Sequence, residues 1–100
     1  MSDQPQQWYV LLHEPVDPLD AGVFADPRFG LHLAFLGRLQ EQGRLVAAGP
    51  LEDQPGTGMA VVRGVDADEA RRIAEEEDES VRQGLFRVRI RPWTVMLSQG

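Results

Sequence analysis

Hydrophobic and polar positions along the chain recur with two periods, and the changes of period divide the sequence into strands and helices. Alternating or continuous apolar runs rich in β-branched and aromatic residues predict strands over residues 8–13, 44–51, 59–63 and 85–91. Apolar positions spaced three and four residues apart predict helices over residues 27–42 and 67–83. The predicted order is therefore strand–helix–strand–strand–helix–strand, which indicates an α+β fold.

The predicted helices carry local signals at their ends. Asp26 supplies an N-cap oxygen for the first helix, and Pro27 suits its first position, where a missing N–H costs nothing. Gly43 is typical of the left-handed residue that ends a helix. Asp66 followed by Glu69 has the spacing of a capping box for the second helix.

Two right-handed crossovers around a central hairpin predict a ferredoxin-like βαββαβ fold, with a four-stranded antiparallel sheet and both helices on one face. The other face of the sheet is left bare, and in a chain of 100 residues a second copy is the most economical way to cover it. We expect residues 1–7 to be a disordered N-terminus and residues 8–98 to form one domain. Pro92 is expected to break the last strand, leaving a short tail.

Composition narrows the classes of function. The net charge of −6 disfavours nucleic-acid binding, which needs a clustered basic surface. The absence of cysteine excludes disulfides, thiol nucleophiles and cysteine-ligated metals. Because no secretory signal and no membrane-length apolar run is visible, we expect a cytoplasmic protein that does not bind membranes.

Two residues stand out as candidate site residues. His32 lies on the apolar side of the first helix, and an imidazole can take or give a proton near neutral pH. Asp78 continues the line of Ala70 and Ala74 at four-residue spacing, so it is predicted to face the sheet. It belongs to an acidic run, residues 75–79, that opposes the helix dipole, and such breaches of local rules concentrate at functional sites. If the two side chains meet, they form an oriented proton-transferring pair; the alternatives are a structural histidine and a solvated acidic surface.

Three further residues are candidates for the same site or its surroundings. Arg28, one turn before His32, is a candidate to hold an anionic substrate group, and its alternative is plain surface charge. Ser80 lies close enough in the chain to hydrogen-bond within the pocket near Asp78. His13 ends the first predicted strand and is predicted to lie at the edge of the sheet, the alternative being that it joins the site. Two histidines and one aspartate are metal-ligand types, but their spacing does not favour a metal site.

Two segments resemble the YCII-related (YciI-like) domain family. The first is HLAFLGRLQEQGRLVAAGPL, residues 32–51, and the second is DESVRQGLFRVRIRPW, residues 78–93. In the second, an aspartate opens a short turn, a glycine follows, and a strand ends in proline and an aromatic residue. The family's aspartate is usually followed by proline, whereas Glu79 stands here.

The resemblance implies a dimeric α+β barrel of ferredoxin-like protomers with a His–Asp active site, which by motif position is His32 and Asp78. It implies a homodimer that takes a small-molecule substrate, in a family whose reactions are mostly unassigned. Lyase- or isomerase-type proton transfer on a small cyclic or phenolic metabolite, without metal or organic cofactor, is the expectation. The alternative is a non-catalytic small-molecule-binding module, or a regulatory or accessory one.

Overall fold

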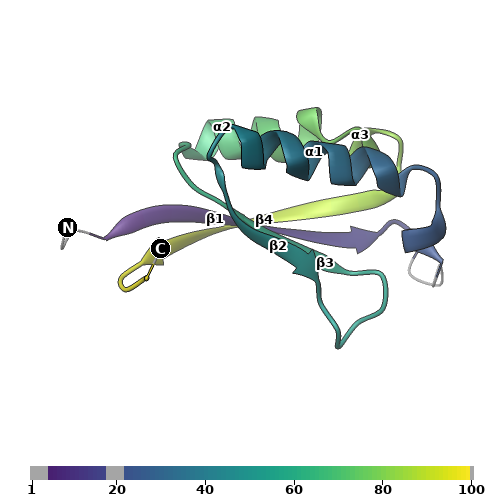
Figure 1. Ribbon diagram of the computed structural model, residues 1–100, viewed down its shortest axis with the longest axis horizontal. Coiled ribbons are helices and arrows are strands. Elements are labelled where there is room, and N and C mark those ends of the chain that lie inside the picture. The colour runs from purple at the N-terminus through teal and green to yellow at the C-terminus, as the bar shows by residue number, and fades with distance from the viewer. Residues whose placement is uncertain (1–4, 18–21, 100) are drawn as a thin grey trace.

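The computed structural model describes residues 5–17 and 22–99 and has one antiparallel sheet covered by helices on one face (Figure 1). Its elements are β1 (Gln6–Pro15), a 3₁₀ turn η1 (Val23–Ala25), α1 (Phe29–Glu41), β2 (Leu45–Pro50), β3 (Gly58–Val62), α2 (Ala67–Arg72), a π-helical turn η2 (Ile73–Glu77), α3 (Glu79–Arg82) and β4 (Phe86–Val95). The strand order is β2-β3-β1-β4, and every neighbouring pair is antiparallel. The predicted α+β fold with its four-stranded antiparallel sheet is confirmed.

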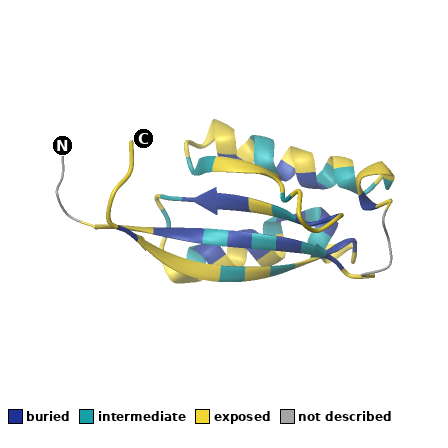
Figure 2. Cartoon of the chain, turned by 90° about the horizontal axis from the view of Figure 1, so that it is seen from below, coloured by how far each residue is buried: buried dark blue, intermediate teal, exposed yellow. Residues whose placement is uncertain are grey.

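The register of the central strand β1 decides which side chains face the helices. Leu11 lies opposite Ala60 of β3 and Ile90 of β4. Since side chains alternate along a strand, Tyr9, Leu11 and His13 share the face toward the helices. Figure 2 shows the buried positions concentrated on the middle strands, and exposed positions prevail on the edge strands β2 and β4.

The main hydrophobic core lies between this face of the sheet and the helices. Phe35 and Leu39 enter it from α1, and Ile73 enters it from η2. The remaining buried members come from β1, β3 and the second helical region: Tyr9, Leu11, Ala60, Val62, Ala70 and Ala74. Small residues along the second helical region let its backbone lie close to the sheet.

Strands β1 and β4 are both longer than the sequence predicts. β1 begins at Gln6, which pairs with Val95, so the last two residues of the expected disordered N-terminus belong to the sheet. The predicted break at Pro92 is wrong: Pro92 pairs with Tyr9 inside β4. Because β4 is an edge strand, the N–H that proline lacks is not needed by a further neighbour.

The helices differ from prediction at their ends and in continuity. α1 begins at Phe29, and Asp26 caps the turn before it by accepting the Arg28 backbone N–H at 2.8 Å. The predicted cap at Asp66 is confirmed, since its side chain accepts the Glu69 N–H at 2.8 Å. The second helix is not continuous, because the π-helical turn η2 divides α2 from α3. None of the helices within the described ranges is long and apolar enough to cross a membrane.

Candidate functional site

Asp78 lies in the break between η2 and α3 and is fully buried. Its backbone is extended, with φ −90° and ψ 104°, so it is the N-cap of α3 rather than part of a helix. Its Oδ1 accepts the Ser80 backbone N–H at 3.0 Å and the Ser80 hydroxyl at 2.6 Å. The prediction that Asp78 continues the helix face of Ala70 and Ala74 is therefore wrong, because Asp78 is not helical. Its side chain nevertheless enters the core. A carboxylate at the start of a helix is stabilised by the backbone N–H groups and the helix dipole, whereas one at the end of a helix is opposed by the dipole.

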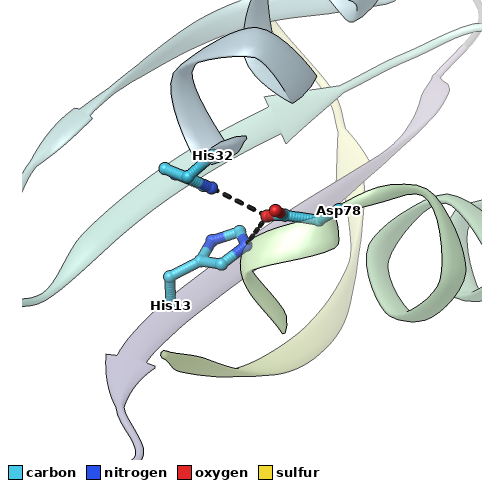
Figure 3. Close-up of side chains that lie close together, drawn as sticks. All are labelled: His13, His32 and Asp78. Carbon is cyan, nitrogen blue, oxygen red and sulfur yellow. Dashed lines mark hydrogen bonds and ion pairs between the residues drawn. The ribbon is translucent and has the colours of Figure 1, made fainter. Parts of the chain in front are cut away.

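His32 reaches Asp78 from α1, on the other side of the same carboxyl group (Figure 3). The distance from His32 Nδ1 to Asp78 Oδ2 is 2.7 Å, and both side chains are buried. A carboxylate can only accept, so Nδ1 carries the proton of this hydrogen bond. Nε2 is then the ring nitrogen available to a molecule beside His32. The sequence expectation that these two residues meet agrees with this geometry.

His13 is the third side chain of the cluster, and the sequence reading misplaced it. Because β1 is a central strand and runs on to Pro15, His13 lies inside the sheet and not at its edge. It is 1 % exposed, and its Nε2 lies 3.3 Å from the same Oδ2 of Asp78. Its ring centroid is 4.5 Å from that of His32 (Figure 3). The alternation of Tyr9, Leu11 and His13 was the signal that could have found it.

The charges of the cluster follow from burial and hydrogen bonding. Burial alone would raise the pKa of Asp78, but the hydrogen bonds from His32 and Ser80 and the close approach of His13 Nε2 outweigh it and hold that pKa well below its ordinary value. Burial lowers the pKa of His13, and the nearby His32 adds to this, while Asp78 opposes it without cancelling it. At neutral pH the site therefore contains an ionised Asp78 and a neutral His13.

The two other predicted residues, Ser80 and Arg28, make different contacts, and neither lines the cavity. Ser80 belongs to the cluster, but it is fully buried and acts on Asp78, and it does not line the cavity beside the histidines. Arg28 lies outside the cavity lining, because its guanidinium binds Asp26 through Nε–Oδ1 at 3.1 Å and Nη2–Oδ2 at 2.9 Å, and the Gln83 carbonyl at 3.0 Å. Hydrogen bonds from Arg28 lower the pKa of Asp26 to about 2. An anion-binding role for Arg28 has no geometric support.

A cavity of about 410 Å³ opens beside the two histidines. It lies among α1, η1, the end of β1, the β2–β3 pair and the start of β4. Its lining consists of His13, Phe24, Phe29, His32, Leu33, Leu36, Ala48, Gly49, Pro50, Gly58, Met59 and Phe86. Among these lining residues, which belong to the described part of the chain, the imidazoles are the only polar side chains. A cavity of this size and apolarity suits a small, largely apolar molecule.

The same cluster contains metal-ligand types, which spacing along the sequence did not favour. One ligand atom each from His13, His32 and Asp78 lie within 4.8 Å of one another. Ligand atoms of a tetrahedral zinc ion with bonds of about 2.0–2.1 Å are about 3.3 Å apart. The 2.7 Å between Nδ1 of His32 and Oδ2 of Asp78 is shorter, so the cluster as it stands is spaced for a shared proton. A zinc ion bound through these two atoms would need one of the two side chains to move.

Comparison with known proteins places the chain in a family. The model of the YCII-related domain matches residues 25–94. No curated protein matches the chain significantly. Among solved structures, 5-chloro-2-hydroxyhydroquinone dehydrochlorinase (TftG) from Burkholderia phenoliruptrix, in complex with 2,5-dihydroxybenzoquinone, is similar with a TM-score of 0.64. The two chains are 20% identical, and the match covers 86% of this chain and 93% of that one, which shows a shared fold. Since the family model spans well over half of its length, this chain belongs to the YCII-related domain family.

Proposed function

We propose that this protein is an enzyme that moves a proton on a small cyclic or phenolic metabolite, with His32 as the base and Asp78 as its partner. The observation that carries the proposal is the 2.7 Å hydrogen bond between His32 Nδ1 and Asp78 Oδ2, made at the wall of an apolar cavity. A histidine so oriented by a carboxylate is a common general acid–base unit. The carboxylate stabilises the imidazolium that forms when the other nitrogen takes a proton.

Elimination and isomerisation both need only such a proton shuttle. In an elimination, Nε2 of His32 takes a proton from the substrate, the electron pair left behind forms a double bond, and a leaving group such as chloride departs with its bonding electrons. In an isomerisation, the same nitrogen returns the proton to a different substrate atom. Each scheme balances with the residues of the site and needs no further reactant, so the proposal includes no cofactor.

The cavity supports a flat, ring-shaped substrate. Phe24, Phe29 and Phe86 lie along its wall, and their rings contact one another or the histidines. Aromatic side chains favour offset or edge contacts with another ring. The dehydrochlorinase of similar fold acts on a chlorinated hydroxyhydroquinone and was solved with 2,5-dihydroxybenzoquinone. Hydroxylated, quinone-like rings are therefore the first class to test here.

Ligand titration tests the substrate class directly. We expect 2,5-dihydroxybenzoquinone to bind the wild-type protein in calorimetry, and Ala48→Phe, which fills the cavity from β2, to weaken binding at least tenfold, about 1.4 kcal/mol. Ala47→Phe is the matched control, because Ala47 is the next residue of β2 and does not line this cavity. Chloride release from 5-chloro-2-hydroxyhydroquinone is then measured on the same proteins. No binding at millimolar ligand, or equal losses in the two variants, would remove this substrate class.

A second candidate is a non-catalytic small-molecule-binding or regulatory module. It is favoured by the lining of the cavity, in which His13 and His32 are the only titratable side chains of the described residues. Such a lining suffices to recognise a ligand without transforming it. Tight binding of the quinone with no turnover of any hydroxylated ring would support this function over the enzymatic one.

We also propose that the protein acts as a homodimer and, as the sequence predicts, in the cytoplasm. The sheet face opposite the helices carries the paired rings of Trp8 and Trp93, at 5.6 Å between centroids, beside Val61 and Val95. Trp93 is 44 % exposed, which leaves apolar surface for a second copy. Light scattering should give twice the chain mass of 11.2 kDa, falling to that mass in Trp93→Asp but not in the exposed tail variant Leu97→Asp. A wild-type monomer at all concentrations would contradict the dimer.

A further inference from the structure

We propose that His13 is a positioning residue: as a neutral imidazole packed on His32, it directs a ring nitrogen at Asp78 Oδ2 and keeps that carboxylate ionised and correctly turned while His32 carries a proton. The inference rests on the proposed function, in which His32 and Asp78 form the proton-transferring pair. It assigns to His13 a role that neither the family match nor the similar structure supplies.

The position of His13 is not explained by packing alone. The preceding helix-facing residues of β1, Tyr9 and Leu11, are members of the apolar core, and a leucine would fit the same pattern. Instead, a histidine lies here with 1 % exposure, and its Nε2 has no hydrogen-bond partner that meets normal geometry among the described residues. A buried polar atom without a partner is destabilising, so its presence needs a reason.

The group that faces Nε2 of His13 is the carboxylate of Asp78. Nε2 of His13 is 3.3 Å from Oδ2 of Asp78, just outside the 2.7–3.2 Å range of a well-formed bond. The other oxygen, Oδ1, is already occupied by both donors of Ser80. Oδ2 therefore lies between two imidazoles, His32 at 2.7 Å and His13 at 3.3 Å (Figure 3).

His13 is suited to a supporting role rather than to proton transfer with a substrate. Its Nε2 is fully buried, so a molecule in the cavity cannot reach this nitrogen. The charged or titratable groups that face its ring are Asp78 and His32, and the rest of its surroundings are the Leu11 backbone and the ring of Phe86 at 5.7 Å. Burial keeps His13 neutral, and a neutral ring beside His32 does not repel the imidazolium.

This arrangement has a consequence for where the proton resides. A neutral imidazole has a single N–H, and the carboxylate at 3.3 Å favours the tautomer of His13 that carries it on Nε2, where it is directed at Oδ2 and in turn favours the ionised carboxylate. With that donor in place, the proton between His32 and Asp78 stays on the imidazole. Without it, Oδ2 becomes more basic and attracts the Nδ1 proton more strongly, so that the charged form of His32 is stabilised further.

Two nearly isosteric variants test the role of the donor. His13→Gln keeps an N–H group at this position, and His13→Met fills a similar volume without one. We expect the midpoint of the NMR titration of the His32 ring protons to rise in His13→Met by about half a pH unit or more, and to stay close to wild type in His13→Gln. Leu11→Val, in the same strand and on the same face, perturbs packing only and should leave the midpoint unchanged.

The titration is measured on the free protein and needs no substrate. It therefore tests the role of His13 even if the protein shows no turnover and the proposed function fails. Equal midpoints in His13→Gln and His13→Met would overturn the inference, as would equal movement in Leu11→Val. If turnover is found, the pH dependence of kcat should move with His13→Met and be restored by His13→Gln, with KM less affected than kcat; identical pH profiles in the two variants would again overturn it.

Discussion

Asp78→Ala is expected to lower the free energy of unfolding by about 3–5 kcal/mol, the range typical of breaking a buried charged pair from one side. The carboxylate is fully buried and accepts from Nδ1 of His32 and from both donors of Ser80. Alanine would leave these donors without an acceptor in the interior and would remove the N-cap of α3. Urea unfolding followed by circular dichroism measures the loss.

The control for this variant comes from the same acidic run. Glu79→Ala removes the next acidic side chain, which is exposed enough to pair with Arg82 at the surface, and should cost less than about 1 kcal/mol. Comparable losses in the two variants would mean that Asp78 is no more than a surface acid.

The pH dependence of stability has a defined sign. The pKa of Asp78 is lowered in the folded protein, so its contribution is complete above the unfolded value of about 4 and is lost as the pH falls below it. The pKa of His13 is also lowered. Below about pH 6.5 the imidazole is therefore protonated in the unfolded chain but not in the folded one, which lowers the free energy of unfolding. Wild-type stability should therefore fall with pH from about 6.5 downward, and Asp78→Asn should flatten the most acidic part of that curve.

His32→Gln is expected to reduce turnover by about 10²–10⁴-fold, the usual contribution of a general acid–base group. Glutamine keeps a side chain in the cavity wall but cannot accept a substrate proton and hold it as a cation. The loss should fall mainly on kcat, since the apolar lining that binds the ring is unchanged.

Chloride release or isomer formation, whichever is found with hydroxylated rings, gives the measurement for His32→Gln. Arg44→Gln serves as the control because Arg44 pairs with Glu69 at 3.7 Å and does not line the cavity. A loss smaller than about threefold in His32→Gln would assign the proton transfer to another group.

The fold could be predicted because its signals are local and repeated. Alternation along the strands, the turn-rich segment between β2 and β3 and the cap at Asp66 each act over a few residues. Pro92 was misjudged because the effect of a proline depends on whether its strand lies at an edge, which is a property of the whole sheet.

The site was predicted unevenly, for identifiable physical reasons. His32 was visible because it interrupts an apolar helix face. Asp78 was predicted from four-residue helical spacing, which the π-helical turn η2 interrupts. Such a turn leaves no clear mark in a single sequence. The place of His13 depended on how far β1 extends, and that of Arg28 on its pairing with its near neighbour Asp26. Local patterns do not decide questions of this kind.

The bond between the Ser80 amide and Asp78 Oδ1, 3.0 Å long, links one backbone position to the charge of the whole cluster. This amide is protected from hydrogen exchange while the carboxyl group stays in place to accept its proton. Any event that moves Asp78 away, such as its capture by a metal ion or a rearrangement on ligand binding, would release the amide and speed its exchange. The exchange rate at a single residue of a four-residue helix is thus a built-in reporter of the state of the site, readable before any substrate is known.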